Sequence, residues 1–164
     1  MEPNAKTGLK NKTVLTRRRL LGAAVIAIAA GAAGWRAFRD PAVYNGNSLT
    51  VSQAHRKAVA GEIILVDIRR PDEWRRTGIG EGAHPIDMRR EDFVRALTQV
   101  AGPDKGAPIA LICARGVRSA RLSNRLTAAG YTNIIDVPEG MLGSRAGPGW
   151  LEENLPTRAF ERGT

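Results

Sequence analysis

The sequence has a single cysteine, Cys113, and only two histidines among its 164 residues. One cysteine excludes an internal disulfide, and it excludes a Cys-x-x-Cys redox pair because no second thiol could resolve a mixed disulfide. His55 and His84 stand alone, which disfavours a metal site, and the sequence predicts neither a metal nor another cofactor. Aromatic residues make up only 5% of the chain and do not alternate with a basic stripe, which disfavours nucleic-acid binding.

The formal net charge of +9 is unevenly distributed along the chain. Residues 1–32 hold six basic residues and one acidic residue, whereas the remainder holds 19 basic and 15 acidic residues. Hydrophobic residues make up 43% and charged residues 25%, which is typical of a globular domain. The excess positive charge therefore lies largely in the N-terminal segment, and the body of the protein is only mildly basic.

Residues 1–34 have the layout of an export signal: Arg17, Arg18 and Arg19, then an uncharged Ala-rich run, then small residues suited to cleavage. The run from Leu20 to Gly34 is shorter than the roughly 20 residues that span a bilayer. An uncleaved membrane anchor is the alternative. The paired arginines resemble a twin-arginine signal, although Leu20 replaces its phenylalanine, and a general secretory signal remains open. We expect a periplasmic or exported protein, in contact with the membrane only through this segment if it is not cleaved.

After a linker over residues 35–47, aliphatic runs alternate with helical patterns, followed by a tail over residues 158–164. The aliphatic runs predict strands buried on both faces. The alternation predicts a single α/β domain over residues 48–157, with a mainly parallel central sheet and helices on both faces. Strands are expected at 63–66, 109–112 and 134–137, helices at 52–60, 91–100 and 118–129, and helical turns at 71–74 and 150–154.

Cys113 directly follows the predicted strand 109–112, so we expect it at the carboxyl edge of the sheet, facing a ligand-binding crevice. Three features favour the reactive thiolate. The following helix begins with unpaired N–H groups, Gly116 allows the backbone to curl around an anion, and Arg115 and Arg118 add positive charge. The alternatives are a buried, inert cysteine and arginines that simply face solvent.

The segment Cys113–Ser119 matches C-x-x-G-x-R-S and resembles the active-site loop of the rhodanese family. The upstream segment 65–74, the downstream segment 126–134, and Gly140, Trp150 and Pro156 resemble further family motifs in the family's order. The resemblance covers about residues 48–157. Segment 78–83 lacks the histidine usual in the family, and segment 141–149 is longer and richer in glycine than in common family members, which implies a different wall for the active site.

The resemblance implies a thiosulfate sulfurtransferase in which Cys113 takes a sulfane sulfur as a persulfide and passes it to an acceptor. The donor would be a small anion, and the acceptor cyanide, a thiol or a carrier protein. Asp67 and Arg69 are expected to form a structural ion pair that orients loops. The residues expected to hold the substrate are those of the loop, namely Ala114, Arg115, Gly116, Val117, Arg118 and Ser119.

Two other functions remain open. A phosphatase or arsenate reductase of the same fold would need C-x5-R, and the position of that arginine is occupied by Ser119. The second alternative is a rhodanese-like module that carries sulfur or binds a protein without catalytic turnover. It remains open because a fold does not guarantee an activity.

Overall fold

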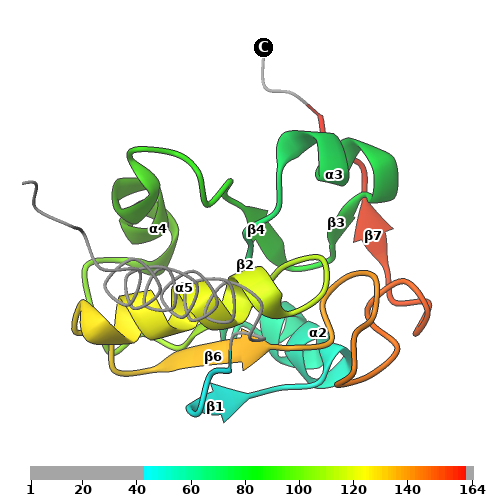
Figure 1. The fold of residues 1–164 in the computed structure, drawn as a ribbon. Helices are drawn as coiled ribbons and strands as arrows, with labels where there is room; N and C mark the ends of the chain where they lie inside the picture. Colours follow the sequence, from blue (N-terminus) through cyan, green and yellow to red (C-terminus); the bar gives the residue numbers. More distant parts are fainter. Residues whose placement is uncertain (1–42, 162–164) are drawn as a thin grey trace, which may run out of the picture. The chain divides into compact units, whose positions relative to one another are not determined.

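Five parallel strands form the central sheet of residues 43–161, the part of the chain that the computed structural model describes (Figure 1). The strand order is β1-β6-β5-β2-β4. A separate antiparallel pair joins β3 to β7. The strands are β1 (Asn47–Ser48), β2 (Ile64–Asp67), β3 (Ile79–Gly80), β4 (Ala83–Pro85), β5 (Ile109–Ile112), β6 (Ile134–Val137) and β7 (Thr157–Arg158).

Helices cover both faces of this sheet, as Figure 1 shows for α2 and α5 on opposite sides of β6. On one face α4 and α5 pack against Val66, Leu111 and Ile134. On the other face α2 packs with Trp74 and Trp150 against the alternate residues of the same strands. The helices are α2 (Val51–Val59), α3 (Pro71–Thr77), α4 (Phe93–Ala101) and α5 (Val117–Ala128).

Local chemistry sets the helix ends. Thr50 and Gln53 form a reciprocal capping box at the start of α2, which satisfies two otherwise free N–H groups. Pro71 occupies the first turn of α3, where its missing N–H costs nothing. Gly102 ends α4 with φ of 76°, a conformation that glycine adopts without the Cβ clash of other residues.

The predicted α/β fold with a mainly parallel sheet is confirmed, and β5 and β6 have the predicted bounds. The segment 150–154, where a helical turn was expected, forms hydrogen-bonded turns, and the turn expected at 71–74 is the start of the seven-residue helix α3. The sequence did not predict strands β1, β3, β4 and β7. Each has only two or three residues, too few to show an alternation of apolar and polar side chains. The predicted export segment 1–34 and most of the predicted linker lie outside the described residues. None of the helices within residues 43–161 combines the length and hydropathy needed to cross a membrane.

Candidate active site

Cys113 lies at the carboxyl end of β5, as predicted, but its side chain is buried. The residue is 1% exposed and belongs to the core cluster beneath α4 and α5. Its Sγ lies 3.6 Å from the hydroxyl oxygen of Ser119, which is itself fully buried. The expectation of a thiol open to a crevice was therefore wrong, because Cys113 shares the sheet face that α5 covers and its side chain points into that interface.

The loop after Cys113 leaves a set of backbone donors free. None of the six N–H groups from Ala114 to Ser119 donates to an acceptor within residues 43–161, and α5 has no side-chain cap. The first turn of a helix always has such orphan donors, and here the preceding loop adds more of them. The residues from Cys113 to Ser119, called the site loop below, therefore offer a group of donors suited to an anion.

Gly116 is required for this loop geometry. Its φ is 80°, and a Cβ added there would lie 2.2 Å from the carbonyl oxygen of Pro138. Real Cβ atoms do not approach a backbone oxygen so closely, so a side chain would push the site loop away from the end of β6.

Residues 141–149, called the covering segment below, lie against the site loop. The N–H groups of Met141 and Leu142 donate to the carbonyl oxygens of Cys113 and Ala114, both at 2.9 Å. Gly140 allows this approach, since a Cβ there would lie 2.6 Å from the Ala114 oxygen. The covering segment is therefore hydrogen-bonded directly to the start of the site loop.

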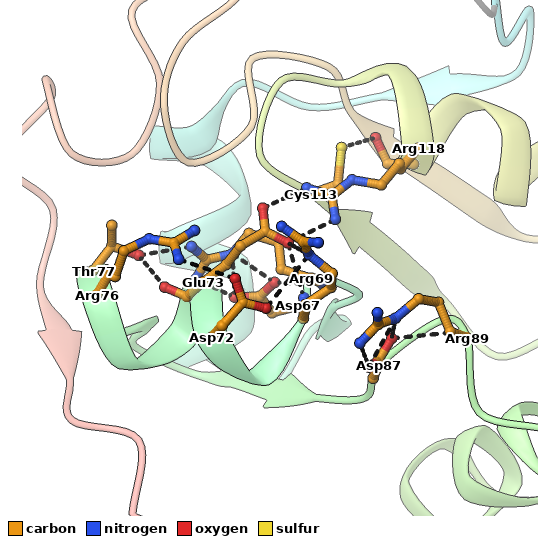
Figure 2. A network of polar contacts seen from close by, with 12 residues as sticks. Asp67, Arg69, Asp72, Glu73, Arg76, Thr77, Asp87, Arg89, Cys113 and Arg118 are labelled. Carbon is orange, nitrogen blue, oxygen red and sulfur yellow. Dashed lines mark hydrogen bonds and ion pairs between the residues drawn. The ribbon is translucent and has the colours of Figure 1, made fainter.

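Arg118 reaches away from the site loop to Glu73 on α3 (Figure 2). Its two terminal nitrogens donate to the two carboxylate oxygens of Glu73 at 2.8 and 2.6 Å. Chiefly because of these hydrogen bonds, and with a smaller contribution from Arg70, the pKa of Glu73 is lowered to about 2. The same contact is the main cause that raises the pKa of Arg118, and the nearby Cys113 adds to it. Arg118 thus places a permanent positive charge near the thiol while its hydrogen-bonding fork is already occupied.

The remaining predicted site residues fall into two groups. Arg115 and Val117 are exposed at the site loop. Asp67 and Arg69 are buried and form the expected ion pair, with Arg69 Nη2 2.7 Å from an Asp67 oxygen. Arg69 also donates to Thr77 Oγ1 and to the Gly78 carbonyl oxygen, so the pair fixes the end of α3 against β2.

Sequence reasoning missed two acidic residues near the site. Glu73 lies in the expected helical turn 71–74 and in the family-like segment 65–74, but the sequence analysis gives it no role at the site, although the Pro-x-Glu pattern shortly after the strand that ends at Asp67 could have drawn attention to it. Asp136 was assigned to a strand, where a lone carboxylate inside the aliphatic run Ile134–Val137 was the available signal.

The family model described as "Rhodanese-like domain" matches residues 50–145, more than half of the chain. A polysulfide-sulfur transferase homodimer from Wolinella succinogenes is 25% identical, with a TM-score of 0.54, covering 70% of this chain and 79% of that one. A rhodanese-like domain protein from Staphylococcus aureus is also 25% identical, with a TM-score of 0.52 and coverages of 70% and 100%.

A protein of unknown function from Rhodopseudomonas palustris, described as a possible tyrosine phosphatase, is 21% identical with a TM-score of 0.51. The match covers 68% of this chain and 84% of that one, and at this identity it shows a shared fold alone. No curated protein matches the chain.

Proposed function

The chain belongs to the rhodanese family, and from this premise we propose that it is a sulfurtransferase that carries a sulfane sulfur as a persulfide on Cys113. The observation that carries the proposal is the set of free N–H groups from Ala114 to Ser119 next to the thiol. Donors arranged in advance stabilise an anion without reorganising during the reaction. Here they would hold the anionic persulfide and the departing anion in turn.

The proposed reaction has two balanced steps. The Cys113 thiolate attacks the outer sulfur of thiosulfate, a new S–S bond forms, the S–S bond of the donor breaks, and sulfite leaves with the electron pair. A nucleophile such as cyanide or a thiolate then attacks the outer sulfur of the persulfide and releases the Cys113 thiolate. This two-step covalent route predicts ping-pong kinetics.

The donor is proposed as a class, a small anion that contains sulfane sulfur. Arg118 near the sulfur and exposed Arg115 at the site loop favour a negatively charged donor. The name of the Wolinella succinogenes neighbour supports polysulfide as a second donor beside thiosulfate. Loading with each donor at equal concentration of sulfane sulfur would rank the two.

Mass spectrometry of the protein after incubation with thiosulfate tests the proposal. We expect a mass gain of one sulfur atom, reversed by cyanide and absent in Cys113→Ser. A wild type that gains no sulfur from thiosulfate or polysulfide would overturn it. Steady-state release of sulfite in the presence of cyanide then separates an enzyme from a carrier, because a carrier loads once and stops.

The buried thiol favours the carrier as the second candidate. Cys113 is 1% exposed, and the covering segment lies against its loop, so access for an acceptor is restricted. A phosphatase is disfavoured because Ser119 stands where C-x5-R requires arginine, and because the guanidinium of Arg118 is held by Glu73. Hydrolysis of p-nitrophenyl phosphate without any sulfur loading would favour the phosphatase.

We further propose that the protein works outside the cytoplasm, directed there by residues 1–34. The motivation is the paired arginines ahead of the uncharged run. Cell fractionation of the full chain should place it in the periplasm or on the membrane. Replacing Arg17 and Arg18 by lysine should block export if the twin-arginine route is used, and should leave export intact if the general route is used. Wild-type protein found only in the cytoplasm would contradict the proposal.

A further inference from the structure

The surface around the site loop carries more positive charge than the binding of a small donor requires. Residues 113–149 contain five arginines, no lysine and two acidic residues, and both acidic residues, Asp136 and Glu139, are buried. Arg118 is paired with Glu73. The other four arginines are exposed, and none of them forms an ion pair within the described part of the chain: Arg115, Arg121, Arg125 and Arg145.

Several arginines on other elements have their charge balanced by an acidic neighbour. Arg76, Arg89, Arg90 and Arg95 each lie within ion-pair distance of an aspartate that is close in the sequence. No exposed carboxylate interrupts residues 113–149, so the positive potential of this stretch is not cancelled in the same way.

The start of α5 and the covering segment bring these arginines to the site loop from two directions (Figure 1). The hydroxyl of Ser144 donates to the Pro138 carbonyl oxygen at 2.8 Å, and this is the oxygen that a Cβ on Gly116 would meet. Arg145 therefore follows a residue that is anchored beside the site loop. Arg121 lies in the second turn of α5, directly after the loop.

Two apolar side chains are exposed next to the same arginines. Val117, the first residue of α5, is 42% exposed, and Leu142 of the covering segment is 43% exposed. The two segments are joined directly, because the N–H of Leu142 donates to the carbonyl oxygen of Ala114. Val117 and Arg121 are one helical turn apart and share the exposed side of α5. Exposed apolar residues accompanied by arginine are typical of surfaces that bind another protein.

We propose that this surface docks the sulfur acceptor, and that the acceptor is an acidic protein with a projecting cysteine. The proposal deepens the sulfurtransferase function and rests on it. Arginine favours carboxylates as partners because its planar fork binds them through two hydrogen bonds, as Arg118 binds Glu73. The acceptor cysteine must project because Cys113 is only 1% exposed, so a thiol level with the surface of the partner would not reach the persulfide.

The transfer step balances without a further reactant. The thiol of the partner loses its proton and attacks the outer sulfur of the Cys113 persulfide. A bond forms between the two sulfur atoms, the S–S bond of the persulfide breaks, and Cys113 leaves as a thiolate with the electron pair. The proton that the partner's thiol released ends on the transferred sulfur.

An anionic membrane is the other large partner that a basic surface attracts. A membrane against this surface would cover the site loop, and no acceptor from solution could then reach the sulfur. The position of the arginines around the entrance to the site therefore favours a protein that itself takes the sulfur.

The first test measures binding to the unloaded full chain and does not depend on sulfur transfer. The probe is a fluorescent peptide rich in Asp and Glu, with serine in place of cysteine, followed by anisotropy at low salt. We expect Arg121→Glu and Arg145→Glu each to weaken binding about tenfold. Arg56→Glu is the matched control, because Arg56 is exposed and unpaired within residues 43–161 and lies on α2, across the sheet.

Two results of this first test would overturn the proposal. One is equal binding by Arg121→Glu and Arg56→Glu. The other is a loss of binding to phosphatidylglycerol vesicles in Arg121→Glu without any loss of peptide binding, which would assign the surface to a membrane.

The second test follows the transfer step itself. The persulfide is formed, freed from donor and mixed with the same acidic peptide carrying its cysteine, or with 2-mercaptoethanol. We expect Arg121→Glu to slow transfer to the peptide about tenfold and to leave transfer to 2-mercaptoethanol nearly unchanged. Equal effects on the two acceptors would overturn the proposal. A wild type that takes up no sulfur would overturn the sulfurtransferase function, and with it the acceptor role, even where peptide binding persists.

Discussion

The two terminal nitrogens of Arg118 are hydrogen-bonded to the two carboxylate oxygens of Glu73, at 2.8 and 2.6 Å. This bidentate pair joins the first turn of α5 to the first turn of α3. It holds the site loop from a neighbouring element and keeps a guanidinium charge close to the sulfur (Figure 2). Arg118 therefore holds the site loop and supplies charge, while the N–H groups from Ala114 to Ser119 have no acceptor within residues 43–161.

Replacement of Arg118 by alanine should lower the rate of persulfide formation from thiosulfate by about tenfold or more. The change removes both the clamp on the site loop and the positive charge near the thiolate. Arg125→Ala is the matched control, since Arg125 is exposed in the last turn of the same helix. Loading is followed by rapid-quench mass spectrometry. Equal losses in the two variants would mean that the exposed face of α5, rather than the site loop, holds the donor.

Stability should depend on Glu73 in a defined pH range. Its folded-state pKa is lowered to about 2, chiefly by Arg118, from an ordinary value of 4.5. The ionised group therefore stabilises the fold above pH 4.5, and this contribution is lost as the pH falls towards 2. We expect Glu73→Gln to lower the free energy of unfolding by about 2 kcal/mol at pH 7 and by less at pH 3.

Urea denaturation at these two pH values measures the effect of Glu73. The exposed ion pair of Asp72 and Arg76 supplies the control, because Asp72→Asn should change stability little. A loss in Glu73→Gln that is the same at pH 7 and pH 3 would show that packing, and not the ion pair, accounts for the change.

The fold and the position of Cys113 were predictable because they depend on local patterns. The aliphatic runs of β5 and β6 are long enough to mark buried strands, and a cysteine after such a strand must lie at the carboxyl edge of a parallel sheet. The orphan donors of α5 also follow from sequence, because every helix begins with unpaired N–H groups. These features depend only on residues that are close to one another in the sequence.

What could not be predicted depends on contacts between distant segments. The burial of Cys113 depends on where α5 packs, and the partner of Arg118 lies 45 positions away. The spacing of residues in the sequence predicts neither the burial of a side chain by a distant helix nor a pairing between distant residues. Asp136 is the sharpest case, since a carboxylate within an aliphatic strand is visible in the sequence, whereas the burial that leaves its Oδ1 without a hydrogen-bond partner within residues 43–161 is not.

Asp136→Asn should stabilise the protein above pH 6. Burial, the main cause, raises the pKa of Asp136 to about 6 from an ordinary 3.8, so its contribution to stability is fully present below pH 3.8 and is lost as the pH rises through 6. Asparagine has the same shape and carries no charge at any pH. We expect a gain of about 1–3 kcal/mol at pH 7.5 and almost none at pH 4, measured by urea denaturation. A destabilised variant at pH 7.5 would mean that the ionised carboxylate is well accommodated.

Gly116→Ala should abolish persulfide formation while most of the fold persists. The new Cβ would have to occupy a position 2.2 Å from the Pro138 carbonyl oxygen, so the site loop must move. Gly102→Ala is a close control because Gly102 has φ of 76° and a Cβ there would meet no atom within 4 Å. The control should lose about 1 kcal/mol of stability from backbone strain and load sulfur normally. Normal loading by Gly116→Ala would show that the loop geometry is dispensable.

The covering segment should control how large a reagent can reach Cys113. Buried Glu139 holds this segment, since its Oε2 accepts a hydrogen bond from the N–H of Gly149 at 3.3 Å. Loss of one such bond is worth about 1 kcal/mol, which corresponds to roughly five- to tenfold in an opening equilibrium. We therefore expect Glu139→Ala to accelerate alkylation of the thiol by a bulky maleimide about fivefold or more.

Iodoacetamide serves as the small reagent in this comparison, and its rate should change less than that of the maleimide because a smaller opening admits it. Glu152→Ala, which alters an exposed carboxylate beyond the end of the covering segment, should leave both rates unchanged. If both reagents accelerate equally in Glu139→Ala, the substitution has opened the core around Cys113 rather than the covering segment. If neither rate changes, the thiol is reached by a route that bypasses residues 141–149.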